Sequence, residues 1–258
     1  MKAQGIIFQQ NPNKFFAQTD YQYYLTQNQY FYSNRLSLFF EKENIVNDIK
    51  ARIEKYFDEF IIDEVQDIAG RDFNFLELLM TTNTKMLFVG DCYQHTFDTS
   101  RDGNVNQTLF KDRNAYVKRF TSKEFILDTK TLINSWRCGK RICEFVSENL
   151  RISISSNRDE TDAVDIIYVV DPIEIATIVN NPEITKLHYK EWYKFGPDRR
   201  NWGDTKGEDD HGDVCVMLNK KTAELHRKGK LQELAPSTRN KLYVAITRAH
   251  GNVYLIDE

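Results

Sequence analysis

The sequence predicts an α/β protein built around parallel sheets. Short apolar runs, of which residues 60–62 and 86–89 are the clearest, alternate with segments that carry apolar side chains at helical spacing. Both runs end in acidic residues, the first at Asp63 and the second at Asp91. Because ligands bind beyond the carboxyl ends of strands in a parallel sheet, these strand ends are predicted to lie at a ligand-binding edge.

The other elements are predicted from the same two periodicities. Apolar side chains at positions 45, 46, 49, 53, 56 and 57 give residues 44–57 the spacing of a helix. The predicted elements are helices at 44–57, 71–80, 139–149 and 239–249, strands at 60–62, 86–89, 164–170, 214–218 and 253–256, and loops at 98–108 and 196–213. Residues 1–45 are rich in Phe, Tyr, Gln and Asn, which predicts a packing surface that contacts something else.

Composition indicates an ordinary globular chain. Of its 258 residues, 41% are hydrophobic and 28% charged, and a net charge of −3 does not favour a dedicated electrostatic binder of nucleic acid. The four cysteines lack metal-ligand spacing and are predicted to be reduced thiols. The first residues lack a signal-peptide core and no apolar run reaches membrane-spanning length, so we predict a cytoplasmic protein with no membrane partner.

The run at residues 60–62 delivers two adjacent carboxylates, Asp63 and Glu64. A hydrophobic strand that ends in Asp-Glu matches a Walker B element, in which one carboxylate holds Mg²⁺ and the other orients the attacking water. Asp63 and Glu64 are therefore candidate metal ligands and catalytic residues. Taken alone, the segment also allows a strand followed by an acidic turn.

A second strand end carries Asp91 and, three residues later, Gln94, whose neutral amide could sense a terminal phosphate. Together the two segments resemble motifs II and III of superfamily 1 helicases, whose patterns are DExQD and GDxxQ. In that family aromatic side chains that stack on bases follow motif III. Phe97 keeps one such platform and is a predicted DNA contact, but Thr99 replaces a tryptophan, which weakens the predicted grip on a single strand.

Residues 132–137 and 242–249 resemble motifs IV and VI of the same helicases. The resemblance implies that Trp136 lies beside the adenine and that Arg137 approaches the γ-phosphate. It also implies that Arg248 is the arginine finger, a guanidinium that neutralises charge on the transferred phosphoryl group. Taken alone, a Thr-Arg pair on a helix would be read as a solvated surface pair.

Residues 203–208 resemble motif V. That resemblance implies nucleotide contacts for Gly207 and Glu208 and DNA contacts for Thr205 and Lys206. The segment follows motif IV by only about 65 residues. This spacing is too short for the large helical insertion of full-size relatives, so a compact second domain is predicted.

The five ordered motifs make the chain similar to the carboxy-terminal two-thirds of a compact UvrD/Rep-like DNA helicase. The resemblance implies two RecA-like (P-loop NTPase type) parallel-sheet lobes, the first incomplete, at residues 1–125 and 126–258. It implies ATP and Mg²⁺ as cofactors and single-stranded or partly duplex DNA as partner. In an intact relative, ATP hydrolysis would drive 3′→5′ movement along single-stranded DNA and unwinding.

One motif of that family is absent from the sequence, the phosphate-binding loop G-x-x-x-x-G-K-[ST]. Gly-Lys pairs occur at residues 139–140 and 229–230 without the upstream glycine or the following Ser/Thr. Since the loop's backbone N–H groups and lysine hold the β- and γ-phosphates, the chain alone is expected to bind nucleotide weakly and hydrolyse almost nothing. A partner that carries the missing amino-terminal half is one expectation.

Two other functions remain open at this stage. The chain could be a non-catalytic, helicase-like module that docks on a nuclease, a motor subunit or DNA, and the missing loop favours this alternative. It could also be a metal-dependent nuclease that uses Asp63, Glu64, Asp67 and Asp91. The nuclease is disfavoured because no lysine or histidine base stands at the usual spacing, and motifs IV to VI would have no explanation.

Overall fold

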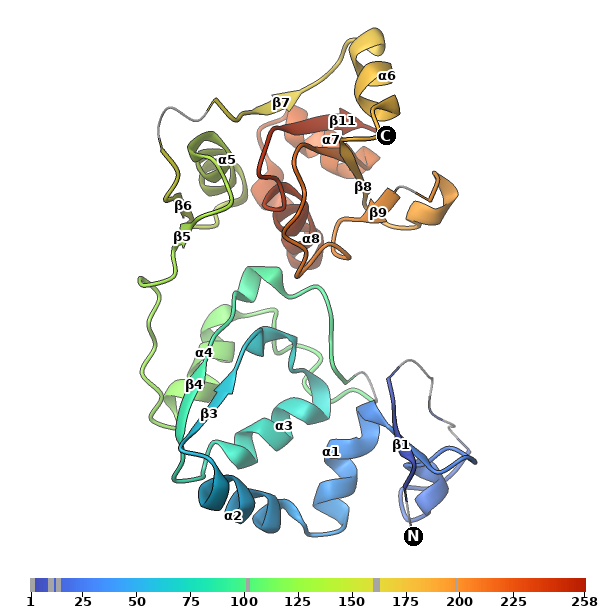
Figure 1. Ribbon diagram of the computed structural model, residues 1–258, viewed down its shortest axis with the longest axis vertical. Coiled ribbons are helices and arrows are strands. Elements are labelled where there is room, and N and C mark those ends of the chain that lie inside the picture. Colours follow the sequence, from blue (N-terminus) through green and yellow to red (C-terminus); the bar gives the residue numbers. More distant parts are fainter. Residues whose placement is uncertain (1–2, 9–11, 13–14, 101–102, 160–162, 198) are drawn as a thin grey trace. The chain divides into compact units, whose positions relative to one another are not determined.

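A computed structural model of the chain describes residues 3–8, 12, 15–100, 103–159, 163–197 and 199–258. The chain divides into two compact units, unit 1 at Met1–Leu127 and unit 2 at Asp128–Glu258 (Figure 1). Three segments that carry predictions lie partly outside the described residues. These are the chain start, at residues 1–2, and the two predicted loops, at residues 101–102 and 198. No helix among the described residues is long and apolar enough to cross a membrane.

Unit 1 begins with an aromatic subdomain. Strands β1 (Gly5–Ile7) and β2 (Tyr30–Tyr32) pair in parallel and lead into helix α1 (Ser33–Lys42). The ring of Phe39 on α1 packs against the rings of Tyr21, Tyr24 and Phe31. The predicted packing surface of residues 1–45 is therefore used in part within unit 1, although Phe8 and Phe15 are exposed.

The rest of unit 1 is a strand–helix–strand unit. Its elements are helix α2 (Val46–Tyr56), strand β3 (Glu59–Ile62), helix α3 (Gly70–Leu79), strand β4 (Lys85–Phe88) and helix α4 (Arg113–Thr121). The predicted helices at 44–57 and 71–80 and both predicted strands are confirmed. Phe73 on α3 is fully buried and packs with Tyr116 on α4, a helix that was not predicted.

Strands β3 and β4 form a two-stranded parallel sheet. Each residue of β3 lies opposite one of β4, from Glu59 against Lys85 to Ile62 against Phe88, so the strands end level with each other. One face packs on the core of unit 1, while Ile61 and Leu87 lie opposite each other on the other face and are 57% and 53% exposed. Parallel sheets usually have both faces covered, so this open apolar face is unusual.

Unit 2 contains a five-stranded parallel sheet in the order β7-β11-β10-β8-β9. The strands are β7 (Ile166–Tyr168), β8 (Thr185–His188), β9 (Arg199–Asn201), β10 (Val214–Leu218) and β11 (Val253–Asp257), and a separate pair joins β5 (Asn134–Ser135) to β6 (Ser155–Ser156). A mixed α/β fold with a parallel sheet, as predicted, is present here.

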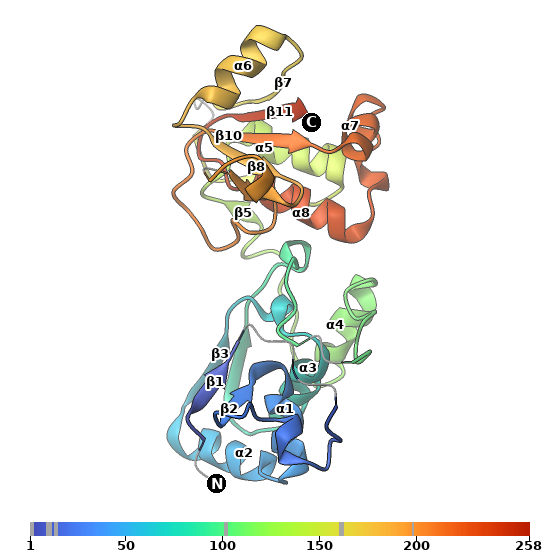
Figure 2. The ribbon, with the colours of Figure 1, turned by 90° about the vertical axis from the view of Figure 1, so that its right-hand side faces the viewer.

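Helices cover both faces of this sheet (Figure 2). On one side lie α5 (Lys140–Phe145), which continues into a π-helical turn at Val146–Leu150, α7 (Lys220–Arg227) and α8 (Pro236–Ile246). On the other side α6 (Pro172–Asn180) packs through Ile178 on Cys215 and Ile256. The strands β10 and β11 are buried between these layers, which explains their continuous apolar sequences.

Several predictions for unit 2 need correction. The predicted loop at 196–213 contains strand β9, and the helix predicted at 239–249 begins at Pro236 and ends at Ile246. Strand β8 was not predicted because its sequence, Thr-Lys-Leu-His, is mostly polar. Its Lys186 is nevertheless buried, and the ammonium group donates a hydrogen bond to the carbonyl oxygen of Asn181.

Candidate functional site

The carboxyl ends of β3 and β4 lie side by side (Figure 1), and a predicted acidic residue follows each of them. The ladder continues past both strands, because Val89 N–H donates to Ile62 O at 2.8 Å and Val65 N–H donates to Val89 O at 3.0 Å. Asp63 and Asp91 therefore leave the same edge of the same sheet, as the sequence predicted. We call the residues gathered here, Asp63, Glu64, Gln66, Asp91 and Gln94, the strand-end cluster.

Gln66 joins the two halves of the strand-end cluster. Its side chain is fully buried, its Oε1 accepts the N–H of Asp91 at 3.0 Å, and its Nε2 donates to the carboxylate of Glu64. A side chain at Gly90 would overlap Gln66 Oε1, so glycine is required where the two loops approach. Sequence reasoning gave Gln66 no role, although it occupies the Gln position of the DExQD pattern.

Asp63 and Glu64 have different environments. Asp63 is exposed, and its Oδ1 accepts the N–H of Glu64 at 2.8 Å. Glu64 adopts a left-handed backbone with φ of 53°, which turns the chain sharply at the strand end, and its carboxylate is held by Gln66. An open carboxylate beside an oriented one fits the predicted division of labour between a Mg²⁺ ligand and a residue that positions water.

The described residues contain no group of three or more His, Cys, Asp or Glu side chains that could hold a metal ion by itself. Among these residues, the four carboxylates of the nuclease hypothesis do not form such a group. Mg²⁺ commonly binds through one or two carboxylates, with water and substrate phosphates completing its coordination. The exposed Asp63 fits that type of site, which needs a phosphate ligand.

Gln94 and Phe97 follow in the next loop. Asp91 caps the short helix Cys92–Gln94 by accepting the N–H of Tyr93 at 2.9 Å, and Gln94 Nε2 donates to the other carboxylate oxygen at 3.2 Å. Phe97 is 56% exposed, as a stacking platform requires. Thr99 has a structural role, since its hydroxyl accepts the N–H of Ala69 at 3.1 Å.

In unit 2 the two predicted arginines meet. Arg137 Nη1 donates to the carbonyl oxygen of Thr247 at 3.2 Å, and the neighbouring Arg248 donates through Nη1 to the carbonyl oxygen of Glu208 at 3.2 Å. Arg137 also forms an ion pair with Asp209. The predicted motif IV, V and VI segments thus converge, and we call Arg137, Glu208, Asp209, Arg248 and His250 the arginine cluster.

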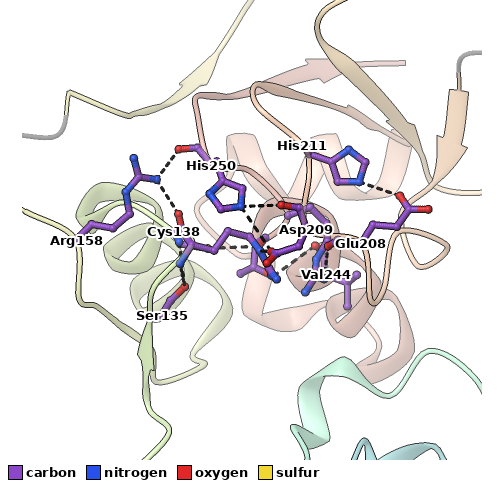
Figure 3. Close-up of polar contacts among 11 residues, drawn as sticks. Ser135, Cys138, Arg158, Glu208, Asp209, His211, Val244 and His250 are labelled. Atoms are coloured by element: carbon purple, nitrogen blue, oxygen red, sulfur yellow. Dashed lines mark hydrogen bonds and ion pairs between the residues drawn. The ribbon is translucent and has the colours of Figure 1, made fainter.

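Side chains from three parts of unit 2 hold the backbone around the arginine cluster, and Figure 3 shows two of them, Ser135 and Arg158. Ser135 Oγ accepts the N–H groups of Arg137 and Cys138 at 3.2 and 3.0 Å and so shapes the turn after β5. Arg158 donates to the carbonyl oxygens of Arg137, at 2.7 Å, and His250. Helix α8 ends one residue before Thr247, whose hydroxyl donates to Tyr243 O at 2.8 Å.

Two histidines line the loop that carries Glu208 and Asp209 (Figure 3). His211 Nε2 lies 2.9 Å from Glu208 Oε2, and His250 Nε2 lies 2.9 Å from the carbonyl oxygen of Asp209. Sequence reasoning missed Asp209, Arg158 and both histidines. Asp209 directly follows the predicted Glu208, so its position was a usable signal.

The electrostatics of the arginine cluster favour an anion. Arg248 is only 3% exposed; burial lowers its pKa, and the charge of Arg137 nearby lowers that pKa further. The hydrogen bond from Arg137, in turn, lowers the pKa of Asp209. A buried guanidinium beside a second one is destabilised by desolvation and by repulsion, and a bound anion would relieve both.

The remaining predicted residues of unit 2 differ in accessibility. Trp136 is 78% exposed, and Gly207 has a φ of +84° with open space around it. Lys206 is half-buried. Thr205 is fully buried, with its hydroxyl 3.5 Å from Trp202 O, so the predicted DNA contact of Thr205 does not fit the structure.

No protein-family profile matches the sequence, and no curated protein matches it. Among solved structures, the chain is similar to a complex of arterivirus nonstructural protein 10 (helicase) with DNA, at 16% identity and a TM-score of 0.47, over 77% of this chain and 39% of that one. It is also similar to the PRRSV helicase, at 18% identity and a TM-score of 0.46, over 76% and 34% of the two chains. A crystal structure of arterivirus nonstructural protein 10 (helicase) is 14% identical, with a TM-score of 0.45, over 82% and 50%. The chain thus spans half or less of these proteins.

Proposed function

We propose that this chain is part of a superfamily 1, UvrD-like DNA helicase, a motor that uses ATP and Mg²⁺ to move 3′→5′ on single-stranded DNA. The observation that carries the proposal is the convergence of Arg137, Glu208 and Arg248 within unit 2. These residues come from three distant segments, which match the family's motifs in order. Segments that only resembled the motifs by chance would have no reason to fold together.

The arginine cluster supplies the charge that phosphoryl transfer needs. Arg248 presents its guanidinium from a buried position, held by the neutral carbonyl oxygen of Glu208. Its planar donors suit a phosphate, and burial strengthens the attraction because water screens it less. Arg137 adds a second positive charge, steadied by Asp209 and by the Thr247 carbonyl.

In unit 1, the strand-end cluster supplies carboxylate and amide groups. A Mg²⁺ ion held here would supply positive charge to offset the charge of the phosphates. Asp63 would hold that ion, and Glu64, oriented by Gln66, would position a water for attack. Gln94, tied to Asp91, would respond to the terminal phosphate.

Binding of an ATP analogue to the full chain is the first prediction. We expect a fluorescent ATP analogue with Mg²⁺ to bind weakly, and Arg248→Ala to reduce the affinity about 10-fold or more, because a charge-assisted hydrogen bond to phosphate is lost. Arg248→Lys should fall between the two. Arg52→Ala, which removes an exposed arginine of α2, should bind as the unmodified chain does.

Circular dichroism spectra of the four proteins would establish that each is folded before titration. Equal affinity of the unmodified chain and Arg248→Ala would contradict the role of the arginine cluster. If the unmodified chain bound no nucleotide at millimolar concentration, the motor proposal would fail for this polypeptide.

The second candidate function is a non-catalytic helicase-like module that docks on a nuclease or a motor partner. The absence of G-x-x-x-x-G-K-[ST] from the sequence favours it. The purified chain is expected to release negligible phosphate from ATP, with or without single-stranded DNA, because the main phosphate cradle is missing. A phosphate-release assay checks this. Robust turnover that Glu64→Gln abolishes would instead identify a complete ATPase.

A further inference from the structure

A small pocket lies in unit 2 at the carboxyl ends of β8 and β10. Its volume is about 140 Å³, and Tyr189, Lys221, Thr222 and Thr238 are among its lining residues. Tyr189 directly follows β8, and its hydroxyl lies 3.2 Å from the hydroxyl of Thr238. In parallel sheets this edge is where ligands bind, yet none of the predicted site residues lies here.

Three lysines lie in or near the pocket. Lys221 lines it, and the ammonium groups of Lys190 and Lys241 lie 6.0 and 5.6 Å from the centre of the Tyr189 ring. In the described part of the chain, none of these three lysines forms an ion pair with a carboxylate. Like charges around a cavity repel one another, and an anion in the cavity would offset that repulsion.

The backbone adds to this positive potential. Helix α7 begins at Lys220, where Asn219 caps it by accepting the N–H of Thr222 at 3.2 Å, and helix α8 begins at Pro236. Both starts contribute lining residues to the pocket. The amino-terminal ends of helices carry partial positive charge, so both helices reinforce the attraction of the lysines for an anion.

Size selects the kind of anion. Pockets that enclose whole small molecules usually measure about 300–1,000 Å³. A volume of about 140 Å³ is too small for a nucleotide but suits one phosphate group with its hydrating water. Lysines and hydroxyl groups, both present here, are common phosphate contacts in nucleic-acid complexes.

Exposed aromatic rings continue from the pocket. The segment after Tyr189 contains Tyr193, 64% exposed, and Phe195, 47% exposed, in and after the short helix Trp192–Lys194. The Phe195 ring stacks on His188 at 3.9 Å, which fixes its orientation next to the end of β8. Aromatic faces beside a basic groove are the usual way to hold unpaired bases without reading their sequence.

We propose that this pocket binds a backbone phosphate of single-stranded nucleic acid, with neighbouring bases stacked on Tyr193 and Phe195. The proposal rests on the proposed function, which supplies the class of ligand. It names a contact region separate from Phe97 and Lys206. Lys221, Lys190 and Lys241 hold the phosphate, and the aromatic rings favour an unpaired strand over a duplex, whose bases are already stacked.

Fluorescence anisotropy of a labelled oligothymidylate with the full chain tests the proposal. Lys221→Gln should weaken binding and reduce the slope of log K against log salt concentration by about 0.7, the contribution of one phosphate contact on a single strand. The pair Lys221→Gln with Lys241→Gln should weaken binding further, while the slope falls by no more than about 0.7, because both lysines hold the same phosphate. Tyr193→Ala should weaken binding about 5-fold or more through lost stacking.

Lys228→Gln is the matched control, because Lys228 is an exposed lysine at the other end of α7. If Lys221→Gln and Lys228→Gln behaved alike, the pocket would be excluded while the motor proposal stood. If the unmodified chain bound no oligonucleotide, both proposals would fail. Equal binding of duplex DNA, or displacement of the oligonucleotide by ATP with Lys221→Gln abolishing ATP binding, would also overturn the assignment.

Discussion

Replacing Trp202 by alanine is expected to lower the free energy of unfolding of unit 2 by about 3–5 kcal/mol, the usual cost of removing a large buried aromatic side chain. Trp202 is fully buried directly after β9. Its indole N–H donates to Leu187 O at 3.1 Å, and its ring packs edge-on against Tyr189 at 5.2 Å. The substitution would leave a cavity between β8 and the loop that carries Glu208.

Hydrogen exchange measured by mass spectrometry on the full chain checks this result, since each unit supplies its own peptides. Faster exchange should be confined to residues 128–258. Trp136→Ala removes an exposed tryptophan from the same unit and should change stability by less than about 0.5 kcal/mol. Trp202→Phe keeps an aromatic ring but leaves the Leu187 carbonyl without its donor, which costs about 1–3 kcal/mol. Indistinguishable hydrogen exchange in Trp202→Ala and Trp136→Ala would contradict the stabilising role assigned to Trp202.

Gly90→Ala is expected to destabilise unit 1 by about 2–6 kcal/mol. The new methyl group would overlap Gln66 Oε1 and lie 3.0 Å from a methyl carbon of Val65. Overpacking of this kind costs about 1–3 kcal/mol. Moving Gln66 aside would also break its contacts with Glu64 and Asp91 and leave buried polar atoms without partners, at about 1–3 kcal/mol more.

Urea unfolding of the full chain, followed by circular dichroism, measures this loss, with hydrogen exchange assigning it to residues 1–127. Gly212→Ala serves as control, because a methyl group there would meet nothing within 4 Å. The urea concentration at which Gly212→Ala is half unfolded should stay close to that of the unmodified chain. A Gly90→Ala protein as stable as Gly212→Ala would mean that Gln66 does not hold the two strand ends together.

The elements of the fold that could be predicted are those whose burial produces a recognisable pattern in the local sequence. Residues 214–218 are predicted as a strand from their continuously apolar sequence. That sequence reflects the burial of β10 on both faces. β8 and β9 escaped prediction because their sequences are largely polar. In β8, a buried lysine finds a backbone carbonyl as partner, and no local pattern records such a distant contact.

The residues of the candidate site also divide into those that local sequence could predict and those that it could not. Asp63 and Asp91 were predicted to lie together because parallel strands end at one edge, an inference that physical reasoning alone supports. The meeting of Arg137 with Arg248 was implied only through the family resemblance. Gln66 and Asp209 stood in or beside predicted motifs, but what each of them does comes from contacts across the fold, which position in a motif does not specify.

Helix α8 separates two positively charged regions along its own axis. The small basic pocket adjoins its first turn, and Arg248 follows its last. Eleven residues at 1.5 Å each separate these ends by roughly 16 Å. Because most of the second half of the helix is packed in the core, that separation is rigid. Two phosphates held at its ends would occupy different atoms, so a nucleotide and a nucleic-acid strand could be bound at once without competing for the same side chains.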